Sequence, residues 1–214
     1  MKKFLLWLEW ILLFVTAPIA IGFGLRNMPW LLLLAGVAVA AGIWLSQHGG
    51  FHRKHFWRGE NPAHERQELK KMLLRFMGCA IALIGLVLAF FPHKLFHFPR
   101  TMPLYWAALL IAYPLLSVYP QELLYRAFFV RRYRHLFPRK EWLLVASALV
   151  FAWMHLIFRN PFAVVLTLVG GLFFTHTYIR TRSLRLVCLE HALYGNLIFT
   201  IGLGEFFSQS PLSL

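Results

Sequence analysis

The chain has 214 residues, of which 59% are hydrophobic, 17% aromatic and only 14% charged, and its mean hydropathy is +0.62. This composition excludes an ordinary soluble domain and predicts a polytopic membrane protein. The formal net charge of +14 does not indicate a nucleic-acid partner, because the lysines and arginines lie in clusters between apolar runs.

Apolar stretches long enough to cross about 30 Å of hydrocarbon follow one another along the chain. They lie at 4–25, 28–46, 72–91, 103–130, 141–158, 161–179 and 184–207. We therefore expect one all-α domain over residues 1–214, a polytopic transmembrane helical bundle with seven spans. The fourth stretch contains Pro114 and Pro120, and because proline removes an amide donor we expect a kink or a break there, which would make eight spans.

The basic residues predict the orientation of the spans. With seven spans, 17 lysines and arginines fall in the segments on the side of the N-terminus, and 4 fall on the other side. The positive-inside rule then places the N-terminus and the basic loop 47–71 in the cytoplasm. Such a protein suits a bacterial cytoplasmic (inner) membrane, so the lipid bilayer is its first expected partner.

A few polar residues inside the apolar runs indicate the candidate site, since ionisable side chains in a membrane usually face a cavity or a partner. In "QELLYR", Glu122 and Arg126 are one helical turn apart and can form an ion pair. The segment "FAWMH" contributes His155, and "LEHALYGN" contributes His191 and Asn196. Together they contain a base, a group that can relay a proton, and donors for an oxyanion, which are the parts of a water-activating site.

The ordered set "QELLYR", "FAWMH" and "HALYGN" resembles the CPBP family, also called Abi or type II CAAX proteases, which are intramembrane glutamate endopeptidases. The family pattern consists of Glu-Glu-x-x-x-Arg, Phe-x-x-x-His and His-x-x-x-Asn or Asp segments on successive membrane helices. The resemblance covers about residues 100–207, which we expect to form the CPBP-like catalytic core. It implies these site residues: Glu122, Arg126, Phe151, His155 and His191.

The chain departs from the family pattern at two positions. Gln121 stands where the first Glu usually lies, although a Gln can still position a water. Gly195 occupies the position four residues after His191, and Asn196 follows it, so on a regular helix Asn196 would lie roughly 140° away from His191. A π-bulge at Gly195 would bring Asn196 back, and we expect Asn196 in the site on that condition.

The resulting prediction is hydrolysis of a peptide bond by a water held between Glu122 and His155. Glu122 is the expected general base, and Arg126 keeps its carboxylate ionised. We expect His155 to orient the water or pass the proton to the leaving amine, and His191, with Asn196, to donate to the oxyanion. The expected substrate is a membrane-embedded or lipidated peptide or protein, and the resemblance implies no cofactor.

Three alternatives stay open at this point. The chain could be a non-catalytic immunity or scaffold protein that keeps these polar residues to hold its helices together. Glu122, His155 and His191 could instead form a two-His, one-carboxylate zinc site with an open fourth position. A small transporter could use the buried carboxylate and imidazoles to relay protons.

Overall fold

The computed structural model describes residues 2–24, 30–48, 57–59 and 61–207. Within this part of the chain every regular element is a helix and there is no strand, which confirms the predicted all-α class. The polar loop expected at 47–71 lies partly outside the described residues.

Alpha-helices make up most of the described residues. They are α1 (Lys2–Ile11), α2 (Ala17–Gly24), α3 (Trp30–Gln47), α5 (Pro62–Phe90), α6 (His97–Thr101), α7 (Pro103–Tyr113), α8 (Tyr119–Glu122), α9 (Phe129–Tyr133), α10 (Lys140–Met154), α11 (Pro161–Thr181) and α12 (Leu184–Thr200). Three π-helical stretches join some of them: η1 (Leu12–Thr16), η3 (Pro114–Val118) and η4 (Leu123–Phe128). Short 3₁₀ turns complete the order: η2 (Pro92–Lys94), η5 (Arg134–Leu136), η6 (His155–Phe158) and η7 (Gly204–Phe207).

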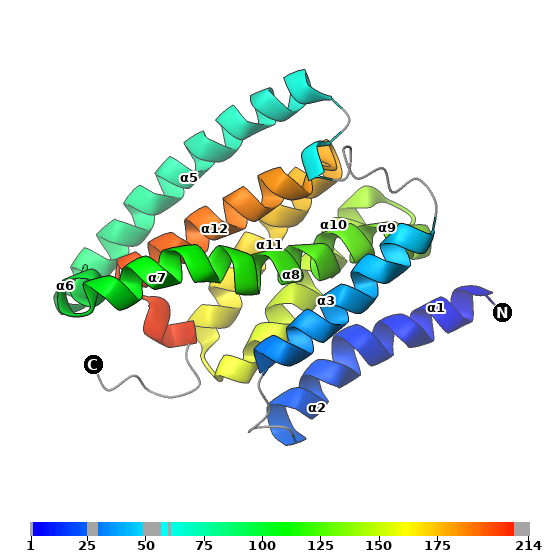
Figure 1. Ribbon diagram of the computed structural model, residues 1–214, viewed down its shortest axis with the longest axis horizontal. Coiled ribbons are helices and arrows are strands. Elements are labelled where there is room, and N and C mark those ends of the chain that lie inside the picture. Colours follow the sequence, from blue (N-terminus) through cyan, green and yellow to red (C-terminus); the bar gives the residue numbers. More distant parts are fainter. Residues whose placement is uncertain (1, 25–29, 49–56, 60, 208–214) are drawn as a thin grey trace.

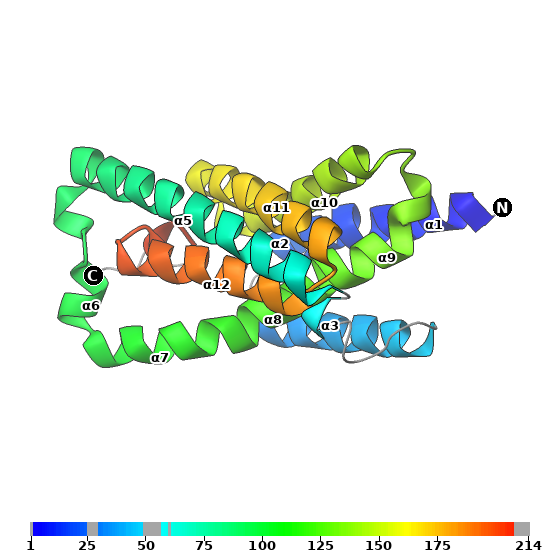
Figure 2. The same ribbon diagram turned by 90° about the horizontal axis from the view of Figure 1, so that it is seen from above.

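Figure 1 shows α5 on one flank of the bundle and α1 on the opposite flank, with α7, α8 and α12 between them. Figure 2, turned by 90°, shows α12 running between α5 and α7, both of which it contacts. The buried core surrounds the segment from α8 to α9, where Phe129 and Tyr133 are fully buried and Phe151 of α10 is 1% exposed. The polar residues of the predicted site therefore lie in the best-packed part of the molecule.

Many apolar side chains face outward. Leu104 is 83% exposed, Leu74 76% and Phe90 72%. Soluble monomers rarely expose large apolar patches, whereas a helical surface of this kind suits contact with lipid. The chain is a multi-pass membrane protein by this surface and by the length of its apolar helices.

Five helical segments in the described residues are long and apolar enough to cross a membrane. They are Lys3–Ile21, Pro62–Phe90, Pro103–Leu136, Lys140–Phe158 and Pro161–Thr181. The other two predicted spans form shorter helices: an apolar one at Leu31–Gln47, and α12, which has 17 residues and carries Arg185 and Glu190. Seven crossings therefore stay a prediction.

The break expected at the prolines of the fourth span does not form, because Pro103–Leu136 is one helical segment. Pro114 begins the π-helical stretch η3, and the backbone N–H of Tyr119 donates to the carbonyl of Pro114, five residues earlier. The wider π turn accommodates residues that lack the ordinary i→i−4 bond, so the helix continues through Pro114 without a break. This segment therefore makes no eighth span.

The predicted end of the loop at residue 71 is also wrong, because α5 begins at Pro62. Asn61 is the cap residue, and its side chain accepts hydrogen bonds from the backbone N–H groups of Ala63 (3.0 Å) and His64 (3.1 Å). An Asn cap followed by Pro at the first helical position is a strong start signal for a helix. The third span is thus longer than the predicted 72–91.

Candidate active site

The ion pair predicted in "QELLYR" forms in the structure. Arg126 Nη1 lies 3.1 Å from Glu122 Oε1, and both side chains are fully buried. The guanidinium also lies over the rings of Phe151 (4.2 Å to the centroid) and Phe174 (5.4 Å). Cation–π contacts with two desolvated rings help to stabilise a positive charge that is buried away from water. Arg126 is thus enclosed by aromatic faces with its charge beside Glu122.

His191 comes from α12 and covers the Glu122 carboxylate. Its Nδ1 lies 2.7 Å from Glu122 Oε1, and its ring stacks on Phe174 with a centroid distance of 4.6 Å and an interplanar angle of 19°. A carboxylate that is ionised beside Arg126 can only accept, so Nδ1 of His191 carries the hydrogen. In the neutral imidazole, Nε2 is then a hydrogen-bond acceptor.

The partner of His191 Nε2 is Tyr113, a residue that the sequence analysis did not identify. The phenol oxygen lies 3.0 Å from Nε2, and the tyrosine ring contacts the imidazole edge to face. Glu122, His191 and Tyr113 therefore form one hydrogen-bonded chain. No motif in the sequence includes Tyr113. The one sequence feature connected with its position is Gly195, whose lack of a side chain leaves space for the tyrosine ring.

His155 lies in η6, directly after α10. Its Nδ1 donates to the backbone carbonyl of Phe151 at 2.7 Å, since a carbonyl can only accept. The rings of Phe151 and His155 lie 4.6 Å apart, so the predicted sharing of one helical face is confirmed. The hydrogen bond at Nδ1 leaves Nε2 as the acceptor nitrogen of the neutral ring.

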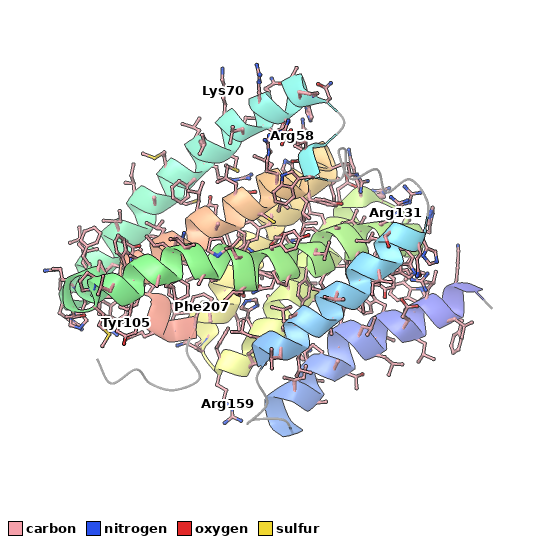
Figure 3. All side chains as sticks on the ribbon, in the orientation of Figure 1. Arg58, Lys70, Tyr105, Arg131, Arg159 and Phe207 are labelled. Carbon is pink, nitrogen blue, oxygen red and sulfur yellow. The ribbon has the colours of Figure 1, made fainter. Side chains whose placement is uncertain are left out.

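A cavity of about 590 Å³ opens beside these residues, and its wall includes Tyr113, Gln121, His155 and His191. Figure 3 shows the side chains of the described residues on the ribbon. Glu122 is fully buried and is not part of the wall, because His191 covers its carboxylate. The expected water between Glu122 and His155 is therefore not what this geometry provides: of Glu122, His155 and His191, only the two histidines line the cavity.

Gln121 does belong to the cavity wall. Its Nε2 donates to the hydroxyl of Ser117 at 2.7 Å, and the side chain is 9% exposed. Its Oε1 is buried and has no hydrogen-bond partner among the described residues. An unsatisfied buried amide oxygen is costly, so this oxygen is a hydrogen-bond acceptor whose capacity is unused within the described residues.

Asn196 does not reach the site. Helix α12 is a regular α-helix from Leu184 to Thr200, so the π-bulge at Gly195 on which the role of Asn196 depended is absent. The side-chain amide of Asn196 instead donates to the carbonyl of Leu110 at 3.3 Å and is not part of the cavity wall. The condition set for its role is not met, and its part in the predicted site is wrong.

The zinc alternative required three ligands in one place. No group of three or more His, Cys, Asp or Glu side chains within the described ranges is arranged to hold a metal ion. Glu122 and His191 are together, but His155 does not join them in such a group.

The segment that contains the site residues matches a known protein family. Residues 102–197 match the family described as Type II CAAX prenyl endopeptidase Rce1-like. No curated protein and no solved structure matches the chain. The matched residues include all three motifs, which on the structure bring Glu122, Arg126 and His191 together next to the cavity that His155 lines. The match confirms that residues 102–197 resemble the type II CAAX prenyl endopeptidases, as the motifs predicted.

Proposed function

We propose that this protein is an intramembrane endopeptidase that hydrolyses a peptide bond with a water activated by the Glu122–His191 pair. One observation carries the proposal: a fully buried carboxylate lies 2.7 Å from an imidazole that faces a large cavity. The match of residues 102–197 to a protease family supports the same reaction.

In the proposed mechanism the proton leaves the water for the Glu122–His191 pair. The carboxylate orients the imidazole through Nδ1–H and stabilises the imidazolium that forms when Nε2 takes up the proton. Arg126 keeps Glu122 ionised, since a buried carboxylate without a nearby cation would become protonated. The role of Glu122 is thereby revised from a direct contact with water to action through His191.

His155 and Gln121 would position the water. His155 is anchored through Nδ1, so its Nε2 can accept one hydrogen of the water while the other points toward the base. Gln121 lies on the same wall, and its buried Oε1, which has no partner among the described residues, would be a second acceptor once its side chain turns toward the cavity. A water held by fixed acceptors attacks with little loss of entropy, which is a large part of the rate gain in such sites.

The proposed substrate is a membrane-embedded or lipidated peptide or protein. The cavity volume of about 590 Å³ is in the range of ligand sites, and its wall is mostly aliphatic and aromatic. A lipid-modified or membrane-spanning segment would bury its apolar surface there and bring one peptide bond to the two imidazoles. The name of the matching family makes a prenylated C-terminus the first class to test.

The proposed orientation has the N-terminus in the cytoplasm, in a bacterial cytoplasmic membrane. Figure 3 shows Arg58, Lys70 and Arg131 toward the end of the bundle where α5 begins and α9 ends, and Arg159 at the opposite end. Three of the residues expected on the cytoplasmic side thus share one end, which supports the positive-inside reading.

The test compares the termini of membrane proteins in host cells that carry the wild-type chain, Glu122→Gln, or Glu141→Gln at matched expression. Glu141 is an exposed carboxylate at the start of α10, so its variant controls for loss of a charge alone. We expect a new terminus with the wild type and with Glu141→Gln, and none with Glu122→Gln. Prenylated and unprenylated versions of one reporter protein, expressed in the same cells, test the substrate class.

A non-catalytic scaffold is the second candidate, favoured by the complete burial of Glu122 and the absence of Asn196 from the site. In that case the ion pair would only join helices. No wild-type-dependent terminus, together with a wild-type phenotype for Glu122→Gln, would replace the protease with the scaffold.

A further inference from the structure

We infer that Tyr113 is a further catalytic residue of this site, whose hydroxyl carries protons between the molecules in the cavity and the His191–Glu122 pair. The inference rests on the proposed function, because it assigns the path by which that pair acts. Neither the motifs nor the family pattern that they resemble includes Tyr113.

The position of Tyr113 supports this role directly. It is the last residue of α7, and its phenol oxygen lies 3.0 Å from Nε2 of His191 while its ring forms part of the cavity wall. The ring is held edge to face against Phe199 at 5.2 Å between centroids. The hydroxyl thus links a residue of the cavity wall to Nε2 of His191, the nitrogen that has to receive the proton.

The direction of the hydrogen bonds follows from Glu122. Because Nδ1 of His191 donates to the carboxylate, Nε2 offers a lone pair, and Tyr113 donates its O–H to it. The phenol oxygen keeps lone pairs of its own, with which it can accept a hydrogen from a water in the cavity. A proton therefore reaches Nε2 through the phenol oxygen, without displacement of either ring.

Gly195 gives an independent observation for the same arrangement. A Cβ at this position would lie 2.3 Å from Cε1 of Tyr113 and 2.4 Å from its hydroxyl oxygen. No such contact is tolerated, so only glycine at residue 195 allows the phenol to reach His191. This is the position at which the family pattern has Asn or Asp, and the structure brings the tyrosine of another helix to the space beside it.

The proton steps balance as follows. In the attack, an O–H bond of water breaks as a new O–H forms on Tyr113, the former phenol hydrogen moves to His191 Nε2, and the water oxygen bonds to the carbonyl carbon. The π electrons of the carbonyl move to its oxygen. In the collapse, the C–N bond breaks, the phenol hydrogen goes to the leaving nitrogen, and Nε2 returns its hydrogen to the phenol oxygen. One water is consumed and both side chains are restored.

The first test is Tyr113→Phe, with Tyr105→Phe as the matched control. Tyr105 lies on the same helix, is 72% exposed, and points away from the bundle in Figure 3. The readout is the initial rate at which the wild-type-dependent terminus forms in membranes from the expressing cells. We expect Tyr113→Phe to lower this rate by roughly 10²-fold or more, as for loss of a general acid–base group, and Tyr105→Phe to leave it unchanged.

The second test distinguishes proton transfer from packing. Incorporation of 3-fluorotyrosine, which is nearly the same size and a stronger acid, should shift the alkaline limb of the pH–rate profile to lower pH at position 113 and leave it unchanged at position 105. A folded Tyr113→Phe protein with the wild-type rate, or an unshifted profile for the fluorinated residue 113, would overturn the assignment while leaving the protease standing. Absence of any wild-type-dependent terminus would overturn both.

Discussion

Oε1 of Glu122, on α8, lies 2.7 Å from Nδ1 of His191, on α12, although the two residues are 69 positions apart in the sequence. Both are buried, so the contact excludes water from the carboxylate and exposes only the imidazole to the cavity. This contact makes the site depend on how α12 packs against the central segment.

Replacing Arg126 by Leu should strongly destabilise the protein, because the buried Glu122 would have to stay charged without its cation or take up a proton at a free-energy cost. Removing one partner of a buried ion pair costs about 3–5 kcal/mol of unfolding free energy. The double variant Arg126→Leu/Glu122→Leu should recover most of this loss, since no unpaired charge is left. Unfolding of the purified proteins in detergent measures both effects, and equal stability of Arg126→Leu and the wild type would contradict the importance of the pair.

Gly195→Ala should reduce terminus formation to the level of Tyr113→Phe, because the added Cβ takes the space of the phenol. The double variant Gly195→Ala/Tyr113→Phe should lose little more than either single variant, since both changes interrupt the same contact. Gly78→Ala, at a helical glycine of α5 that does not line the cavity, is the control: its Cβ would meet no side chain and no other helix within 4 Å. If the rate of terminus formation in the double variant fell by the product of the two single losses, the two changes would not act on the same contact.

Asn196→Ala should leave the rate of terminus formation within about a factor of two of the wild type. The side chain donates one hydrogen bond, to the carbonyl of Leu110, and does not reach the cavity. Loss of one such bond costs only about 0.5–1.5 kcal/mol of stability. A loss of activity as deep as that of Glu122→Gln would show that Asn196 enters the site after all.

Arg75→Met should loosen α5 from the bundle. Arg75 lies 2.5 Å from the fully buried Glu190 of α12 and donates to Thr177 of α11. Its loss leaves Glu190 buried and unpaired, so we expect about 3–5 kcal/mol of destabilisation. Lys71→Met, one turn earlier on α5, removes a cation whose side chain is 58% exposed, and should cost at most about 1 kcal/mol. Protease sensitivity of α5 and unfolding in detergent provide the comparison.

Contacts within one helix could be predicted from the sequence, because helical spacing alone determines which residues meet. Glu122 and Arg126 pair as their four-residue separation indicates, and Phe151 lies against His155 for the same reason. The long apolar runs also predicted an all-helical membrane protein. These features depend on the 3.6-residue period of the α-helix and on the thickness of the hydrocarbon core of a bilayer. Both are general quantities that do not depend on how one helix packs against another.

Local backbone irregularities were predicted less accurately from the sequence than contacts within one helix. The sequence analysis allowed a π-bulge at Gly195 and expected a kink or break at the prolines. Within the described residues the π turns lie instead at Leu12–Thr16, Pro114–Val118 and Leu123–Phe128, and α12 is regular. Helix α5 begins at Pro62, ahead of the predicted start, because Asn61 caps it. A glycine permits several geometries, and the residues that pack against it decide which one occurs.

The sequence by itself determined the helical class, the membrane setting, the family resemblance of residues 102–197 and the members of each motif. Only the tertiary structure decided that His191 covers Glu122, that Asn196 faces Leu110, and that Tyr113 occupies the space beside Gly195. The reason is that these contacts join different helices, and their geometry depends on helix rotation and on the volume of side chains that have no regular spacing along the chain.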